Sequence, residues 1–264
     1  MPLRTGSVLV GAMLLAALVG AIWTPFPIGR QDFSVQLVGP SWPHVLGTDA
    51  FGRDLLSRVL VGAGLSLRVG LGAVAIGLSI GALLGLSAGW RGGWLDDVAM
   101  RLVDALYAFP AILMALLLSA VFQPGTATAA VAIGLAFVPH FARIARASAL
   151  ASRGSPQLEA GRAVGAGPLR LLTRYLLPDA SGPLIVQASQ AVSLAVLAEA
   201  ALSFLGLGSP PDAASWGVML REAQTFLGLS PWPAIVPGLA IVVTVLGWSL
   251  LGDGLRDVVD PRTR

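Results

Sequence analysis

Long apolar runs, separated by short polar stretches, form the main pattern of the chain. Polar and apolar positions do not alternate within these runs, whereas a membrane-spanning strand alternates over about ten residues. A helix needs about 20 apolar residues to cross the hydrocarbon core of a bilayer. The pattern therefore predicts an all-α, polytopic membrane protein with six transmembrane helices. We expect these helices at about 7–23, 66–89, 98–121, 127–147, 183–205 and 233–252.

Three of the runs have features that bear on this prediction. The first follows Arg4 and resembles a secretory signal peptide, but we interpret it as an uncleaved first transmembrane helix. The third is interrupted by Asp104 and Pro110. The second carries glycines four residues apart, which form a smooth face for another helix; packing within the chain and a subunit interface both explain this face. These glycines are Gly77, Gly81, Gly85 and Gly89.

The composition indicates a lipid environment. Charged residues make up 12% of the 264 residues and hydrophobic residues 55%, whereas a soluble domain has about 25% charged residues. The chain has no cysteine, which excludes disulfides and thiolate metal sites. All 17 basic residues are arginines, and the net charge is only +3. The arginines lie at the ends of apolar runs, so membrane topology explains them better than a nucleic-acid-binding face.

The distribution of the arginines sets the expected orientation, because positive residues concentrate in cytoplasmic loops. An N-in, C-in topology places most arginines in the cytoplasm and five on the opposite side. Residues 50–67, which hold part of this minority, have the pattern of an amphipathic helix on the membrane surface. The five arginines on the opposite side are Arg30, Arg53, Arg58, Arg68 and Arg221.

This topology divides the chain into two parts. Residues 1–65 would hold the first transmembrane helix and a periplasmic segment with the interfacial helix. Residues 66–264 would hold the other five transmembrane helices, a cytoplasmic loop at about 153–178 and a periplasmic loop at about 206–232.

The cytoplasmic loop is a polar, arginine-rich insert between the fourth and fifth apolar runs. Ser155-Pro156 is a typical pair of N-cap and first-turn residues, and Gly165 can end the helix that they begin. Pro168 can begin a second helix, and we expect Pro178 to end the region. The insert should therefore form a helix, a bend and a second helix at the membrane surface.

The spacing of Glu159-Ala160, Gly165 and Leu177-Pro178 resembles the Glu-Ala-Ala loop of ABC-type importer permeases. In that family the loop is a coupling helix that docks into a groove on the cytoplasmic ATPase subunit. Gly161 stands where the family usually has a second alanine, and Tyr175 stands where it usually has isoleucine. An ordinary amphipathic loop helix is the alternative. The resemblance implies ATPase coupling for Glu159, Ala160, Gly161, Arg162, Gly165, Ala166, Leu177 and Pro178.

Further motifs, from about residue 40 to the C-terminus, resemble the dipeptide, oligopeptide and nickel permease subfamily, and within it the "C"-type subunit. The resemblance implies a type I ABC importer transmembrane domain in the bacterial inner membrane. The motifs are His44-Val-Leu-Gly-Thr-Asp49-Ala-Phe-Gly-Arg53-Asp54-Leu-Leu-Ser-Arg58, Gly92-Gly-Trp94-Leu-Asp96-Asp97, Phe109-Pro110, Glu199-Ala-Ala-Leu-Ser-Phe-Leu-Gly-Leu-Gly208, Pro210-Pro211, Ser215-Trp216-Gly217 and Leu251-Gly-Asp253-Gly-Leu-Arg256-Asp257.

The same resemblance implies the partners of the chain. These are a second, related permease that completes a heterodimer, two cytoplasmic ATPase subunits and a periplasmic or lipid-anchored solute-binding protein. ATP and magnesium would bind to the ATPase subunits, so no cofactor is expected in this chain.

Four residues are candidates for a gate or a substrate pathway: Glu199, Asp104, Ser215 and Trp216. Acidic residues inside membrane helices are functional candidates by default, and Glu199 and Asp104 both lie in apolar runs. Glu199 can bind a substrate amine or a metal, or it can fix the helix bundle through a buried ion pair or hydrogen bond. We favour the structural role. Ser215 and Trp216 lie in the periplasmic loop, which is longer than most connections.

The sequence contains no zinc-protease, serine-hydrolase or phosphate-loop motif, and His44 and His140 alone are too few for a zinc site. We therefore expect no catalytic site in this chain. The resemblance implies a permease subunit that moves dipeptides or oligopeptides. Nickel or a metal chelate is the alternative solute. An ATP-independent channel or ion-driven transporter is the alternative class of protein.

Overall fold

The computed structural model describes residues 2–259, which are almost entirely helical and contain no β-strand in that range. The helices form at the apolar runs because only a helix satisfies its own backbone hydrogen bonds within lipid. Their bounds are α1 Pro2–Ile22, α2 Leu55–Arg91, α3 Gly93–Tyr107, α4 Ala111–Phe122, α5 Thr126–Ala151, α6 Pro156–Ala163, α7 Pro168–Leu171, α8 Leu177–Phe204, α9 Trp216–Ala223 and α10 Trp232–Val259. Short turns lie at Phe33–Val35 and Gln224–Phe226, and a π-helical turn lies at Leu172–Leu176.

Five helical stretches are long and apolar enough to cross a membrane: α1, α2, α5, α7 continued through α8, and α10. The sixth expected span is the pair α3 and α4, which meet at an angle of 87°. Pro110 is the N-cap of α4, and a proline disfavours helical geometry at the residue before it. The all-α membrane fold is confirmed, and the third expected span is broken at this proline.

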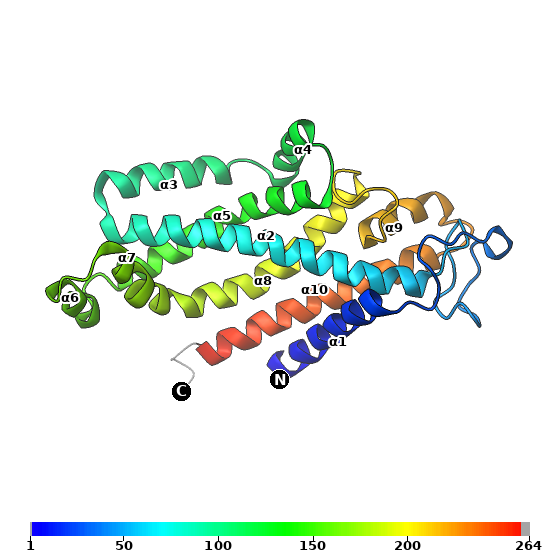
Figure 1. The fold of residues 1–264 in the computed structure, drawn as a ribbon, viewed down its shortest axis with the longest axis horizontal. Coiled ribbons are helices and arrows are strands. Elements are labelled where there is room, and N and C mark those ends of the chain that lie inside the picture. Colours follow the sequence, from blue (N-terminus) through cyan, green and yellow to red (C-terminus); the bar gives the residue numbers. More distant parts are fainter. Residues whose placement is uncertain (1, 260–264) are drawn as a thin grey trace.

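Figure 1 shows the helices running along the long axis of the molecule. The helices α6 and α7 lie at one end, and α9 lies at the other with residues 23–54. We call these the insert end and the loop end. The start of α1 packs against the end of α10, where a Cβ on Gly254 would collide with Leu3. Both termini of the described chain therefore lie away from the loop end, as the expected N-in, C-in topology requires.

The glycine stripe of α2 packs against α5 within this chain. A Cβ on Gly81 would lie 2.7 Å from the Val138 carbonyl oxygen, and one on Gly89 would lie 2.8 Å from that of Arg146. The two backbones approach so closely because glycine has no side chain. Packing within the chain is confirmed as the explanation of this stripe, and α2, α5 and α8 enclose the core.

The expected interfacial helix at 50–67 is wrong, because these residues do not form a separate surface helix. Asp54 caps the N-terminus of α2, which continues without interruption for 37 residues. Arg58 and Ser66 are buried in the bundle, so the polar face of this segment contacts protein instead of lipid headgroups. The proposed boundary between residues 65 and 66 consequently falls inside α2.

The expectation that Pro178 ends the insert is also wrong. Helical structure continues from Pro168 to Phe204, and Pro178 lies in the first turn of α8. The π-helical turn at Leu172–Leu176 directly precedes this proline. Such local changes of helical pitch let a membrane helix accommodate the hydrogen bond that proline cannot donate. The insert is therefore mechanically continuous with the helix that follows it.

Candidate functional site

The insert is built around α6, whose N-terminus forms as the sequence predicts. Ser155 accepts a hydrogen bond from the Leu158 amide at 3.4 Å, and Pro156 occupies the first turn. Leu158 and Gly161 are the buried residues of α6. Gly165 ends this helix with φ at +73°, a left-handed conformation that glycine adopts readily. The helix–bend–helix prediction is confirmed for this part of the insert.

The two departures from the family pattern lie against each other. A Cβ on Gly161 would be 3.0 Å from Cζ of Tyr175 and 3.1 Å from a methyl group of Leu171. The Tyr175 ring therefore occupies the space that an alanine methyl at position 161 would need. Gly161 and Tyr175 form a complementary pair that joins α6 to the π-helical turn.

The outward face of the insert carries both charged and apolar side chains. Glu159, Ala160 and Arg162 are exposed, and neither charged residue makes an ion pair within the described part of the chain. Val164 is 79% exposed and Leu169 is 73% exposed. The sequence motif did not single out Val164 and Leu169.

Two hydrogen bonds fasten the residues just before α6 to the membrane helices. Arg153 Nε donates to the Gly89 carbonyl oxygen near the end of α2 at 2.6 Å. Ser152 Oγ donates to Asp179 of α8 at 2.8 Å. Because Ser155 caps α6 directly after these residues, α6 begins next to the point where the chain is bonded to α2 and α8.

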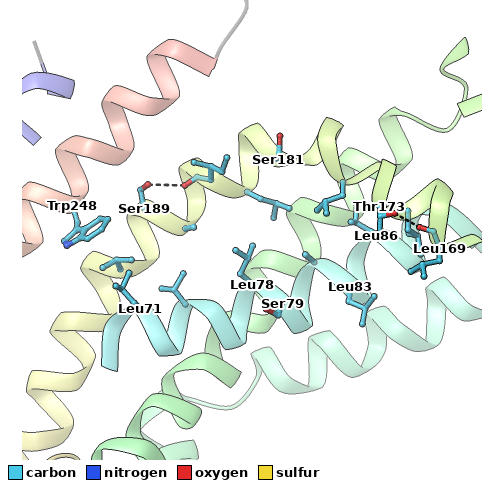
Figure 2. A pocket seen from close by; sticks show the side chains of 18 residues that line it. Leu71, Leu78, Ser79, Leu83, Leu86, Leu169, Thr173, Ser181, Ser189 and Trp248 are labelled. Atoms are coloured by element: carbon cyan, nitrogen blue, oxygen red, sulfur yellow. Dashed lines mark hydrogen bonds between the residues drawn. The ribbon is translucent and has the colours of Figure 1, made fainter. Parts of the chain in front are cut away.

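An open apolar groove of about 680 Å³ lies beside the insert. Figure 2 shows that side chains of α2, α8 and the insert line it, with Trp248 of α10 at its far end. Leu169, Leu172 and Thr173 come from the insert, and Leu177 comes from the start of α8. The predicted coupling residues Leu177 and Pro178 are both exposed. They lie at the start of α8, whereas Glu159, Ala160, Gly161 and Arg162 lie on α6 and Gly165 and Ala166 lie in the bend after it.

Glu199 lies at the centre of a buried cluster of serines. Its Oε1 accepts hydrogen bonds from Ser203 at 2.7 Å, Ser215 at 2.9 Å and Ser209 at 3.2 Å. Its Oε2 accepts one from Ser66 of α2 at 3.3 Å. The side chain is fully buried, and no arginine contacts it within the described range. The carboxylate thus ties α2, α8 and the N-terminus of α9 together.

Of the other candidates for a gate or pathway, Ser215 and Trp216 lie beside Glu199 and Asp104 does not. Trp216 follows Ser215 in the chain, is buried, and donates from Nε1 to the Val59 carbonyl oxygen at 3.1 Å. Asp104 lies apart from these residues on α3, is exposed, and pairs with Arg143 at 2.7 Å. The structure therefore brings Glu199, Ser215 and Trp216 together and leaves Asp104 elsewhere.

A second buried polar cluster at the loop end was missed from the sequence. Arg53 contacts Asp49 and Glu222 at 2.6 Å each, and Arg58 contacts Asp49 at 2.6 Å and Glu222 at 3.1 Å. Both arginines are among the five that the expected topology places on the non-cytoplasmic side. That unusual position was the one feature of the sequence that could have indicated this cluster. These ion pairs join the start of α2 to α9. Within the described residues no group of three His, Asp or Glu side chains is arranged to hold a metal.

The multi-pass helical fold, together with a family match and relatives named as permeases, shows that the chain is a permease, the membrane component of an ABC importer in the inner membrane. The chain belongs to the family described as binding-protein-dependent transport system inner membrane component, whose model matches residues 81–264.

One relative is a putative peptide transport system permease of Brucella suis, which is 41% identical over 99% of this chain and 88% of its own length. Another is the glutathione transport system permease GsiD of Pectobacterium atrosepticum, which is 39% identical over 98% of this chain and 87% of its own length. The dipeptide transport system permease DppC of Alkalihalophilus pseudofirmus is 38% identical over 98% and 85%.

Two solved structures share the fold. An inward-facing structure of the MetNI methionine ABC transporter matches with a TM-score of 0.60 at 21% identity, over 78% of this chain and 96% of that chain. An amino acid ABC transporter with histidines matches with a TM-score of 0.57 at 18% identity, over 76% and 94%.

Proposed function

We propose that this chain carries peptides across the inner membrane as one of two permease subunits, and that α6 receives the movement of a cytoplasmic ATPase. The observation that carries the proposal is the insert itself. It presents a charged and apolar outer face, and its inner face is fastened to α2 and α8. Relatives named for peptide, dipeptide and glutathione transport support a peptide as the solute.

The proposed mechanism is alternating access between two conformations. Closure of the ATPase dimer on ATP displaces α6, and the Arg153 and Ser152 hydrogen bonds carry this displacement to α2 and α8. A bound partner or solute shifts such an equilibrium only by its difference in affinity for the two states. ATP and magnesium bind to the ATPase subunits, and a solute-binding protein delivers the peptide at the loop end.

Within this mechanism Glu199 has a positioning role. Its four serine partners hold α9 against α2 and α8, so the loop end moves with these helices as one body. We assign the gate at the loop end to this unit, which includes Ser215 and Trp216. Asp104 is placed outside it, because its partner Arg143 lies on α5.

The test of ATPase coupling is a double substitution on the outer face, Glu159→Arg with Gly165→Trp. We expect normal membrane insertion but loss of ATPase association and of ATP-driven peptide uptake. The reason is that Glu159→Arg reverses the charge of the docking face, while Gly165→Trp adds a bulky side chain and strains the backbone where α6 ends, because φ at Gly165 is +73°. Co-purification from membranes and uptake into proteoliposomes measure these two effects.

The matched control is Arg30→Glu, which reverses one exposed charge in the segment of residues 23–54. This control should bind the ATPase subunits and support uptake as the unsubstituted chain does. Unchanged ATPase association in the double variant would contradict the assignment of α6 as the coupling element.

A further inference from the structure

The packing of α1 against α2 gives the depth of residues along α2. The 21 residues of α1 extend about 30 Å, which equals the thickness of the hydrocarbon core. Near the end of α1, Gly20 lies directly against Leu60 of α2. One boundary of the hydrocarbon core therefore lies close to the level of Leu60.

Arg68 lies inside this boundary. It is eight residues beyond Leu60, which corresponds to about 12 Å along the helix axis. Its side chain turns back toward the boundary, since Nε donates to the Gly64 carbonyl oxygen at 3.2 Å. The residue is exposed on this chain, and within the described range no acidic side chain pairs with it. The guanidinium thus retains nitrogen donors for an anionic ligand.

Non-helical backbone lies beside Arg68 at the same depth. Arg68 lines a recess of about 250 Å³ together with Thr126, the first residue of α5. The connection from α4 to α5 precedes Thr126, and its residues Gln123 and Pro124 are exposed. In Figure 1, α4 stands out from the bundle just before α5 begins.

The charge of Arg68 and the non-helical backbone beside it both exclude lipid as the neighbour of this surface. Charged side chains within membrane spans face a bundle interior or a water-filled cavity. Non-helical backbone at membrane depth occurs only where it is buried in protein or lines such a cavity. Arg68 does not face the interior of this chain, because Ser66, two residues away, faces Glu199 there. The remaining neighbours are a second permease and the aqueous path between the two permeases.

We propose that Arg68 lines the transport path at this recess and binds the carboxylate of the passing solute. A free peptide carries a carboxylate at its C-terminus, and arginine binds carboxylates with paired, charge-assisted hydrogen bonds. Thr126 lies within the same recess and offers a hydroxyl group. This inference rests on the proposed function for its solute, but the exposure of Arg68 to water can be tested separately.

The first test uses the absence of cysteine from the chain. Arg68→Cys is made in a complete complex whose other subunits carry no reactive cysteine, and it is treated with a charged, membrane-impermeant methanethiosulfonate. Rapid modification is expected, because a thiol in water ionises and reacts whereas a thiol in lipid does not. The control is Leu15→Cys on the outer side of α1, which is 61% exposed and should stay unmodified. An unreactive Arg68→Cys would overturn the inference.

The second test concerns charge. Uptake of radiolabelled alanyl-leucine into proteoliposomes should fall about tenfold or more in Arg68→Cys, because a hydrogen bond to a charged group is lost. Treatment with an aminoethyl reagent restores a cation and should restore uptake, whereas a sulfonatoethyl reagent should not. ATP hydrolysis and complex assembly should stay unchanged.

The outcomes of the second test separate the possible ligands. Parallel loss of assembly and ATP hydrolysis would mean that Arg68 holds the complex together instead of binding the solute, and it would overturn the inference. Equal recovery with both reagents, or no loss of uptake, would also overturn it. If the unsubstituted complex takes up neither alanyl-leucine nor glutathione, the proposed peptide function itself fails, and the assignment of Arg68 to a solute carboxylate fails with it.

Discussion

Position 161 is a glycine, and the absence of a methyl group there lets α6 pack closely against the π-helical turn that follows it. Gly161 and Tyr175 both depart from the usual family residues, and the tyrosine ring fills the space beside the glycine. Each departure alone looks like a weakening of the motif. Together they form a filled contact, because the tyrosine ring lies where a methyl group at position 161 would lie.

This pairing gives a prediction at the residue scale. Gly161→Ala should destabilise the insert by about 1–3 kcal/mol, because the added methyl overpacks a filled contact. Adding Tyr175→Ile should recover most of that loss. Thermal unfolding of the purified chain and co-purification of the ATPase subunits measure the effect. A double variant as impaired as Gly161→Ala alone would show that the two residues are not complementary.

At the scale of elements, five spans and the buried structural role of Glu199 were predictable, but the break between α3 and α4 and the partners of the buried polar groups were not. Hydrophobicity is a local property, so the apolar runs predicted these five membrane helices, and Ser155-Pro156 predicted the start of α6. The cluster at the loop end depends on partners far apart in the chain: Arg53 and Glu222 are separated by 169 residues. Without those partners the charges of residues 50–67 suggested a surface helix.

The same limit applies to the bends and to the site. Pro110 breaks a span while Pro178 does not, because the π-helical turn before Pro178 accommodates it. That turn leaves no mark in the hydrophobic pattern. The motif predicted the insert and its exposed charged residues, but the exposed Val164 and Leu169 and the serine shell around Glu199 became visible only in three dimensions.

The Glu199 cluster gives a prediction for the joint between α2, α8 and α9. Glu199→Ala should lower the thermal stability of the protein strongly, because four buried hydroxyl donors lose their acceptor, at about 1–3 kcal/mol for each group left unsatisfied. Glu199→Gln keeps one oxygen acceptor and should cost less. Ser34→Ala, an exposed serine of the segment 23–54, is the control. Equal stability of Glu199→Ala and the unsubstituted protein would contradict the positioning role.

At the scale of the whole molecule, long helices connect the insert end to the loop end. The insert end presents α6 outward and fastens it to α2 and α8. The buried carboxylate clusters bind these helices to the loop end. Between these ends, Arg68 of α2 lines a recess together with Thr126 of α5. Such a body suits a subunit that transmits force and lines a path while its partners hydrolyse ATP.

ATP-dependent uptake of a radiolabelled dipeptide by the complex in proteoliposomes tests the proposed coupling most directly. The complex contains this chain, the second permease, both ATPase subunits and the solute-binding protein. We expect uptake that requires ATP and the ATPase subunits and that disappears with Glu159→Arg and Gly165→Trp. Uptake at the same rate from the permease subunits alone, without ATPase or ATP, would contradict it.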